Sequence, residues 1–447
     1  MRLVDAFIPT IGRDFLLEPS IPAREVRGRN WRLNTCASAR RRHWKPRWNA
    51  SALQNGSGSA LSVEFVVAAD VGGTNSRLSL FPRPSLHSPS SLSGGLEPVA
   101  SVKYKNDDYK SFDEVVDTFL LTCSDSLRVL PSRKSIVMAC FAVAGVVRDN
   151  SITFTNRADW VVDGYEMRRA FGFPCVLLND FAANGYAVTS LQKHEYTTLQ
   201  PGSNADPHGV IAVVGAGTGL GECFVVPFST SQDAPSPSAR RYGVFGSEGG
   251  HVDFAPQTDL ELKMVQWMQA RLRERLEKPE IVNPHVSVER VVSGKGVFNV
   301  YRFLRAEFPE RVDLECDEKI MQSSDPGAMI TRLAPAYGLA VQSLEIVLSA
   351  YGSEVGNVAL KYVPTGGLFI AGGIAPALLR MLPDQLVNPE SRFRVAMVSK
   401  GRMRDLVQSL PVHVITADDL GVRGALVYAV QLLFERTDSK MPEKSPR

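Results

Sequence analysis

Residues Val66–Phe81 read VVAADVGGTNSRLSLF: an apolar run, an aspartate, the turn Gly-Gly-Thr-Asn, and a second run with alternating apolar positions. This pattern predicts a β-hairpin whose turn exposes backbone N–H groups. A similar stretch, IAVVGAGTGLGECFVV, follows at Ile211–Val226. Glycines in both turns would let an anion approach the backbone amides without meeting a Cβ atom. Two such hairpins in one chain indicate a duplicated phosphate clamp.

A third glycine turn, Gly372-Gly373, follows the apolar run Leu368–Ile370, so the common nucleotide motifs need testing. The chain contains no G-x-x-x-x-G-K-[ST] sequence. In GAGTGLG neither register completes G-x-G-x-x-G, because Leu220 and Glu222 stand where the third glycine would be. The sequence therefore argues against a P-loop enzyme and against a Rossmann dehydrogenase.

Composition limits the class of protein further. The 447 residues are 44% hydrophobic and 22% charged, which suits a globular protein of two domains around a cleft. The six cysteines form no C-x-x-C pair and have no histidine at metal spacing, which indicates a reducing compartment and no structural zinc. No apolar run approaches the roughly 20 residues that span a bilayer, so we expect no membrane partner.

The net charge of +3 originates in the N-terminal segment, residues 1–63, where no acidic residue lies between Val26 and Ser62. This bias resembles an organellar transit peptide; a disordered tail or a DNA-binding arm are the other interpretations. The rest of the chain is slightly acidic, which argues against a nucleic-acid partner for the folded body. We expect a cytoplasmic protein, or one directed to plastid or mitochondrion by the Arg-rich N-terminus.

Between the motifs, apolar spacing predicts strands alternating with helices, as in an α/β protein of two lobes. Strands are expected at 135–147, 175–178, 368–370 and 411–416, and helices at 112–121, 181–188, 259–276, 331–360 and 421–434. Residues 64–190 plus 421–437 are assigned to a smaller α/β lobe and residues 191–420 to a larger α/β lobe.

Six motifs carry a resemblance to a known family. DVGGTN, LLNDFAANGYAV, GAGTGLG, SEGGHVDFAP, VSVERVVSGKGVFNVYR and FIAGGI follow the order and approximate spacing found in bacterial-type glucokinases. The resemblance runs from about Phe65 to Phe434. It implies ATP:glucose 6-phosphotransferase activity and the two-lobed, duplicated actin-like ATPase (ribonuclease H-like) fold with a central cleft. The zinc-binding cysteine cluster of the related ROK sugar kinases is absent, so the chain resembles the non-ROK branch.

By this resemblance, Asp180 in LLNDF is the general base. A carboxylate within hydrogen-bond reach of the sugar 6-hydroxyl can take its proton as the γ-phosphoryl arrives. By position alone, Asp180 would instead be interpreted as the cap of the helix that follows. The two roles are compatible, since one residue can be both cap and base.

The resemblance also implies a set of sugar ligands, which supply acceptors and donors around a hydroxyl-rich ring. These are Asn179, Glu248, His251, Glu289 and Asn156. Taken alone, Glu248-x-x-His251 is equally compatible with a surface turn or half a metal site, and it lacks the second histidine of H-E-x-x-H. The Thr-Asn-x-x-Trp segment around Asn156 is longer by one residue than in the family.

The nucleotide would lie against the three glycine turns, and the implied cofactors are ATP and Mg²⁺. Asp70 resembles the residue that orients Mg²⁺ through water, which suits a cation that is slow to shed its hydration shell. The implied ATP contacts are Asp70, Gly72, Gly73, Thr74, Asn75, Gly217, Thr218, Gly219, Gly372 and Gly373.

The function implied is phosphorylation of glucose to glucose 6-phosphate with release of ADP. Alternatives are a kinase of the same fold for another hexose or phosphoryl donor, and a sugar-binding regulator without turnover. The resemblance also implies a homodimer.

Overall fold

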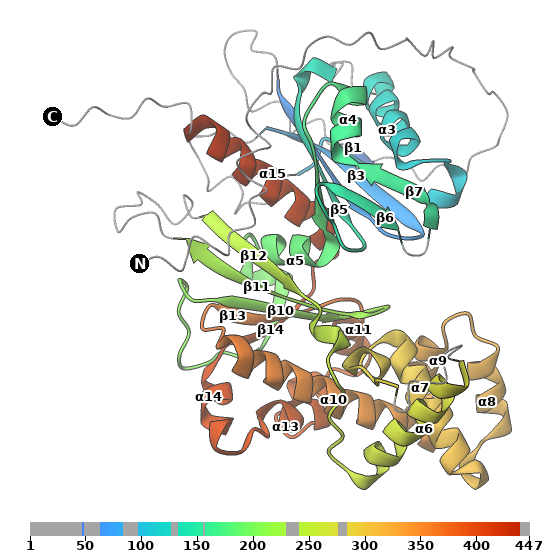
Figure 1. Ribbon diagram of the computed structural model, residues 1–447. Helices are drawn as coiled ribbons and strands as arrows, with labels where there is room; N and C mark the ends of the chain where they lie inside the picture. The colour runs from blue at the N-terminus through green and yellow to red at the C-terminus, as the bar shows by residue number, and fades with distance from the viewer. Residues whose placement is uncertain are drawn as a thin grey trace. The chain divides into compact units, whose positions relative to one another are not determined.

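The computed structural model describes residues 47–48, 63–83, 97–126, 133–154, 157–228, 241–275 and 284–438. They form two compact units (Figure 1): the described residues up to 83, Glu97–Leu178 and those from Ala429 onward make up the first, and those within Asn179–Tyr428 make up the second. The predicted smaller lobe extended to residue 190 and resumed at 421. The structure places the first boundary earlier, after Leu178, because helix α5 (Asp180–Val188) packs on strands of the second unit, and the second boundary later, before Ala429.

The first unit is built on a six-stranded sheet of order β1-β4-β3-β2-β5-β8. Its strands are β1 (Arg47–Trp48), β2 (Phe65–Val71), β3 (Asn75–Pro82), β4 (Ala100–Lys105), β5 (Ile136–Val143) and β8 (Cys175–Asn179). The predicted first hairpin is β2–β3, paired antiparallel from Phe65–Pro82 to Val71–Ser76. Strand β5 pairs parallel with β2. The predicted N-terminal extension contributes an edge strand, since β1 pairs with β4; residues 1–46 lie outside the described chain.

Helices α3 (Phe112–Ser126) and α4 (Gly164–Phe171) and the β6–β7 ribbon (Ser151–Phe154 and Arg157–Asp163) complete the first unit. Its core joins α3, β5 and β7 through Phe112, Phe119, Phe141 and Trp160, which are almost fully buried. The alternation of apolar residues seen in the sequence follows from this arrangement, since β3 buries one face against α3.

The second unit repeats the same sheet plan. Its order is β12-β11-β10-β13-β14-β9, with β12, β11 and β10 antiparallel and with β10, β13 and β14 parallel. The strands are β9 (Tyr196–Gln200), β10 (Ile211–Ala216), β11 (Leu220–Phe228), β12 (Arg241–Ser247), β13 (Gly367–Ala371) and β14 (Val412–Ile415). Hairpin β10–β11 thus occupies the place that β2–β3 holds in the first sheet. This repetition confirms the predicted duplicated α/β fold.

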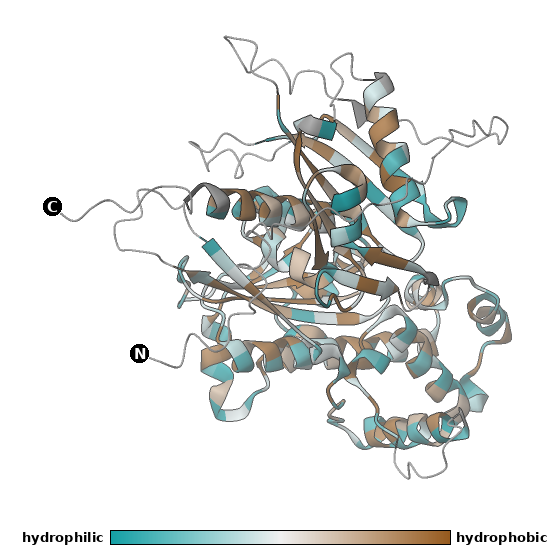
Figure 2. Ribbon diagram, turned by 45° about the horizontal axis from the view of Figure 1, so that its top comes forward, coloured by the Kyte–Doolittle hydropathy of each residue, from teal (hydrophilic) through white to brown (hydrophobic). Residues whose placement is uncertain are grey.

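Helices cover both faces of the second sheet. Figure 1 shows α10, α13 and α14 along one face, while α5 packs on β11 and β12. The helices are α6 (Asp259–Arg275), α7 (Gly294–Glu307), α8 (Leu314–Met321), α9 (Pro326–Leu333), α10 (Gly338–Tyr362), α11 (Ile374–Met381), α12 (Asp384–Val387), α13 (Arg392–Val398) and α14 (Arg404–Ser409). Figure 2 shows the strands of the sheets mainly in the hydrophobic colour, as expected of buried strands. Helix α15 (Leu420–Asp438) closes the described chain.

The helix expected at 331–360 is wrong as a single element. The structure breaks it into α9 and α10, which meet at 111°, and Tyr337 at the break is buried and extended. In the described residues no single helix is long and apolar enough to cross a bilayer; only the bent pair α9 and α10 meets the length and composition test, jointly. Helix α10 approaches α13 closely, because a Cβ atom at Gly352 would lie 2.0 Å from the carbonyl oxygen of Phe393.

Candidate active site

The second hairpin is the centre of the candidate site in the larger unit. Its turn, Gly217–Gly219, is closed by a hydrogen bond of 2.8 Å from the Gly217 N–H to the Gly219 carbonyl. The Gly217 carbonyl in turn accepts a 2.8 Å bond from the Gly294 N–H at the start of α7. Thr218, at the tip, is exposed. The turn is therefore fixed by its hydrogen bond to the start of α7, while its tip at Thr218 is exposed to solvent.

The third glycine turn lies beside the second. Strands β10 and β13 are parallel neighbours with Gly215 opposite Ala371, so the turns that follow them leave the same edge of the sheet. A Cβ atom at Gly217 would lie 3.8 Å from the Gly373 nitrogen. Gly372 has φ +80°, and a Cβ atom there would lie 2.3 Å from the Ala216 carbonyl oxygen, so only glycine fits. The structure thus brings four predicted nucleotide glycines together.

Glu289 joins this hairpin directly. Its Oε2 accepts a 2.9 Å hydrogen bond from the Leu220 N–H, at the first residue after the turn. A Cβ atom at Gly219 would meet the same Oε2 at 2.4 Å, so the glycine makes room for the carboxylate. Glu289 lies in the 3₁₀ turn η7 (Val288–Arg290), whose position is fixed by the Ser293 hydroxyl donating to the Glu289 carbonyl at 2.7 Å. A predicted sugar ligand and a predicted phosphate turn are therefore in contact.

Glu248 and His251 flank the 3₁₀ turn η6 (Gly249–His251), which packs on the start of β11. A Cβ atom at Gly250 would lie 2.0 Å from the Leu220 carbonyl oxygen. The side chains of Glu248 and His251 are exposed, with Glu248 Oε2 and His251 Nε2 3.7 Å apart. His285, which the sequence did not single out, holds this segment through its Nε2, 2.7 Å from the His251 carbonyl oxygen.

Asn179 and Asp180 stand at the N-terminus of α5. The Asn179 side chain is the helix cap: its Oδ1 accepts hydrogen bonds from the amides of Phe181 at 2.9 Å and Ala182 at 3.0 Å. Asp180 is the first helical residue, and its Oδ1 accepts a 2.8 Å bond from the Phe181 N–H. The interpretation of Asp180 as the main cap is therefore wrong, because Asn179 makes the typical capping bonds to the second and third amides.

Phe181 packs the start of α5 on the hairpin. A Cβ atom at Gly221 would meet the Phe181 ring at 2.3 Å, and one at Gly215 would meet it at 3.0 Å. The two glycines therefore leave room for the ring against β10 and β11, and this packing holds the start of α5 on the hairpin. The predicted site residues of this unit therefore lie either in the turns after β10 and β13 or in the segments α5, η6 and η7 that pack around hairpin β10–β11.

The first hairpin, β2–β3, belongs to the other unit. Its turn is closed by the Gly72 N–H donating to the Asn75 carbonyl at 3.0 Å. Thr74 is exposed, and Gly73 and Asn75 are half-buried. Desolvation by the surrounding protein raises the pKa of Asp70, against the opposing charges of Arg77 and Lys103, although the residue keeps solvent exposure.

Asn106, a fully buried residue that sequence reasoning missed, holds this turn. Its Nδ2 donates to the Gly72 carbonyl at 2.7 Å, its backbone N–H donates to the Thr74 carbonyl at 2.9 Å, and its Oδ1 accepts from the Ser76 hydroxyl at 2.8 Å. The only signal in the sequence was an Asn-Asp-Asp run after the alternating stretch Ala100–Lys105, which is typical of any turn. Asn156, the remaining predicted sugar ligand, lies outside the described residues.

Comparison with known proteins identifies the family. A glucokinase family model matches residues 67–432. The glucokinase of Nostoc sp. is 36% identical over 381 residues, covering 82% of this chain and 99% of that protein, and the Synechocystis sp. glucokinase is 35% identical over 386 residues, covering 83% and 99%. A glucokinase crystal structure from an Antarctic psychrotroph has a TM-score of 0.62 at 29% identity, covering 82% of this chain and 98% of its own. The Balamuthia mandrillaris glucokinase in complex with glucose shares the fold, with a TM-score of 0.60 at 20% identity over 86% and 96% of the two chains. The family match across most of the chain and the near-complete alignment with curated relatives show that the chain belongs to the glucokinase family.

Proposed function

We propose that the chain transfers the γ-phosphoryl group of ATP to the 6-hydroxyl of glucose, giving glucose 6-phosphate and ADP. The observation that carries this proposal is the convergence of Asp180, Glu248, His251 and Glu289 on one glycine hairpin. Carboxylates and an imidazole are groups that recognise sugar hydroxyls, and a glycine turn whose tip, Thr218, is exposed lets phosphate oxygens approach the backbone. The family supports the same reaction.

In this mechanism Asp180 is the catalytic residue. Its carboxylate takes the proton of the 6-hydroxyl while the sugar oxygen bonds to the γ-phosphorus and the bond from that phosphorus to the β,γ-bridging oxygen breaks, so ADP leaves. Its bond from the Phe181 N–H restricts the carboxylate to one orientation. Glu248, His251 and Glu289 would bind the remaining sugar hydroxyls, and the Glu289–Leu220 bond ties that ring position to the phosphate turn.

Magnesium is the cofactor expected with ATP, and Asp70 would hold it through water. A single carboxylate at the end of β2 suits Mg²⁺, which is usually bound by one or two carboxylates together with substrate phosphates and water. In the described residues no cluster of three or more histidine, cysteine or acidic side chains could form a protein-only metal site, which is consistent with such shared coordination. When bound, the ion would neutralise charge on the β- and γ-phosphates.

The test compares ADP formation by the wild type, Asp180→Asn and Asp325→Asn, with glucose as acceptor. We expect Asp180→Asn to lower kcat by about 10²- to 10⁴-fold, the usual contribution of a general base, with little change in the denaturation midpoint. Asp325 caps helix α9 by accepting from the Ala328 N–H, and asparagine caps equally well, so this control should retain full activity. No glucose-dependent turnover by the wild type, or an unimpaired Asp180→Asn variant, would refute the assignment. A panel of hexoses and phosphoryl donors tests the same-fold alternatives.

Two further predictions from the sequence accompany this proposal. We propose that the protein acts in the cytoplasm, or in plastid or mitochondrion if residues 1–63 serve as an address; imaging a fusion of these residues to a fluorescent protein distinguishes the two. We also propose a homodimer, which light scattering of the purified protein tests.

A further inference from the structure

The turn η6, which carries the predicted sugar ligands Glu248 and His251, rests on a buried carboxyl group. A Cβ atom at Gly249, the first residue of η6, would lie 2.0 Å from Oε2 of Glu222, so the backbone of the turn touches the carboxyl. The Ser247 hydroxyl joins the same two segments, because it donates to the Glu222 carbonyl at 3.3 Å and accepts from the Gly249 N–H at 3.3 Å. Glu222 has no part in the proposed reaction, yet it contacts the segment that would bind the sugar.

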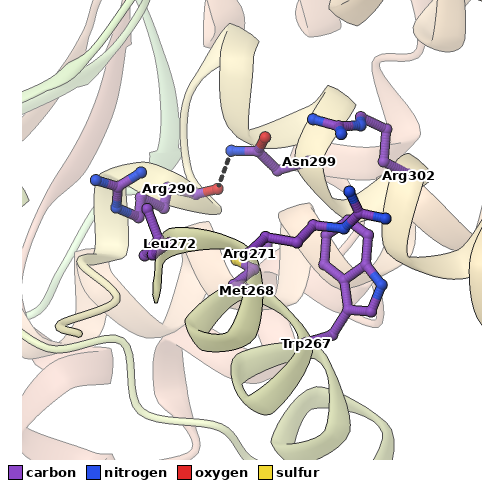
Figure 3. A pocket seen from close by; sticks show the side chains of 7 residues that line it. All are labelled: Trp267, Met268, Arg271, Leu272, Arg290, Asn299 and Arg302. Carbon is purple, nitrogen blue, oxygen red and sulfur yellow. Dashed lines mark hydrogen bonds between the residues drawn. The ribbon is translucent and has the colours of Figure 1, made fainter. Parts of the chain in front are cut away.

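On another side, η6 is followed by a segment that is fixed by neutral donors. The Val288 N–H of η7 donates to the Val252 carbonyl, directly after η6, at 2.9 Å. Turn η7 is itself tied to α7, because Asn299 Nδ2 donates a 3.1 Å hydrogen bond to the Arg290 carbonyl, drawn in Figure 3. Amide donors and carbonyl acceptors do not titrate near neutral pH. These contacts therefore hold the segment equally at pH 6 and at pH 8.

The charged groups that act on Glu222 come from α10. Burial first, and the Glu354 carboxyl second, raise the pKa of Glu222 to about 7, while the charge of Lys361 opposes the shift. Lys361 is bonded to Glu354 at 3.3 Å, and Lys400, two residues after α13, is bonded to Asn357 at 2.7 Å. In the described part of the chain neither Glu222 oxygen has a hydrogen-bond partner, and 1% of the residue is exposed. The site therefore accommodates the neutral acid and leaves an ionised Glu222 unpaired.

The other elements around this carboxyl present uncharged groups or groups with partners of their own. Its cross-strand partners are Val214 on β10 and Ser247 on β12. At the end of η6, His285 Nε2 lies 2.7 Å from the His251 carbonyl oxygen and His285 Nδ1 lies 2.6 Å from Asp253 Oδ1. The imidazole of His285 is thus engaged by the segment that it holds.

We propose that Glu222 is a positioning residue for the sugar: its neutral carboxyl seats η6, and ionisation displaces the turn and weakens glucose binding. The effect on glucose rests on the proposed function, whereas the seating of η6 does not. A buried carboxylate without a partner is costly, so its ionisation favours a rearrangement that admits water or a donor. Turn η6 is the neighbour that can move, because the side chains of Glu248 and His251 are exposed while α10 is packed in the core.

The direction of the effect follows from the proton. The neutral acid predominates below the Glu222 pKa of about 7, so glucose should bind most tightly at acidic pH and more weakly as the pH rises. If sugar binding requires the proton, the KM for glucose increases about tenfold between pH 6 and pH 8. This is the full effect of one titrating group, and a turn displaced only in part would give less.

Steady-state kinetics at pH 6, 7 and 8, with ATP saturating, compare the wild type, Glu222→Gln and the exposed control Glu310→Gln. Glutamine keeps the shape of Glu222 without its charge, so the increase in KM for glucose should be lost in this variant and retained in the control. The titration of His251 and His285 is common to all three proteins and cancels in the comparison. The kcat, which depends on Asp180, should respond to pH alike in all three. A merely structural role of Glu222 would leave the pH profile of KM unchanged.

Hydrogen exchange measured by mass spectrometry tests the seat of η6 without any sugar. In the peptide spanning residues 248–254, protection corrected for the intrinsic exchange rate should fall between pH 6 and pH 8 in the wild type and stay constant in Glu222→Gln. Should Glu222→Gln fail to fold, Lys361→Met decides instead. Because the Lys361 charge lowers the pKa of Glu222, its removal should move the loss of protection to higher pH.

Protection of this peptide that is the same at pH 6 and pH 8 in the wild type would overturn the proposal. So would a KM profile that Glu222→Gln shares with the wild type, or a loss of protection that Lys361→Met leaves at the same pH. Absence of glucose-dependent turnover by the wild type would refute the proposed function instead, and hydrogen exchange would then decide the seating of η6 alone.

Discussion

Glu222 is a buried carboxyl that makes the stability of the larger unit dependent on pH. It lies on β11 with 1% of its surface exposed, and no donor in the described part of the chain lies within hydrogen-bond reach of either oxygen. Burial first, and the Glu354 carboxyl of α10 second, raise its pKa from 4.5 to about 7, while the charge of Lys361 opposes the shift. Lys361 instead pairs with Glu354 at 3.3 Å, and Lys400 bonds to Asn357 at 2.7 Å. Glu222 is therefore left without a cation of its own.

The sign of the effect follows from this pKa. Because the folded-state pKa lies above the unfolded value, the proton on Glu222 stabilises the fold fully below about pH 4.5. That stabilisation is lost as the pH rises toward 7 and stays lost above it. A pKa difference of this size corresponds to about 3 kcal/mol. Replacing Glu222 by glutamine keeps the shape and removes the charge, and its amide can donate to Glu354.

We therefore expect Glu222→Gln to be more stable than the wild type by up to about 3 kcal/mol at pH 8 and nearly equal to it at pH 5. Urea denaturation followed by circular dichroism at pH 5, 6, 7 and 8 measures the difference. The control Glu310→Gln changes an exposed glutamate and should show no pH-dependent difference. A Glu222→Gln difference that is the same at pH 5 and pH 8, or a variant less stable at pH 8, would show that Glu222 is not a buried ionised group.

Three further changes test how the site is supported. Gly249→Ala would place a methyl group 2.0 Å from Glu222 Oε2, so we expect a loss of about 1–3 kcal/mol and a higher KM for glucose, both relieved in part when Glu222→Asp is added. Asn106→Ala removes the side-chain bonds to the first hairpin turn and should cost about 1–3 kcal/mol and raise the KM for ATP with kcat less affected; an unchanged KM would contradict its positioning role. Glu195→Gln weakens the paired bonds of 2.6 and 2.7 Å from Arg423, which lower the Glu195 pKa. It should therefore cost about 1–3 kcal/mol at pH 7, a difference that disappears as the pH falls below the range in which Glu195 ionises; equal stability at pH 7 would refute it.

The sequence predicted what is encoded locally. An apolar run before a glycine turn and a second, strand-like run after it predicted each hairpin, and both hairpins were found, β3 ending one residue beyond the predicted limit and β11 two. Asn106 could not be predicted, because its role depends on a backbone carbonyl thirty-four positions away. The bend between α9 and α10 was also missed, although Pro335 lies at the break and a proline inside a helical pattern ends or kinks the helix. The Asn106 contact joins segments that are distant in sequence. The bend between α9 and α10 is a change of direction inside an apolar stretch.

The position of the second hairpin explains why so many predicted residues meet there. Strands β10 and β13 are parallel, so the turns after both emerge at one edge of the sheet, as ligand-binding turns do in parallel sheets. Helix α5 starts at the same hairpin because Phe181 needs the two flat surfaces that Gly215 and Gly221 provide. Glu289 reaches the hairpin only because position 219 has no side chain. The glycines of GAGTGLG therefore do more than form the turn: Gly219 also admits the Glu289 carboxylate, and Gly215 and Gly221 admit the Phe181 ring. Alanine at 221, outside the predicted phosphate-binding turn, should thus impair sugar phosphorylation by displacing the start of α5.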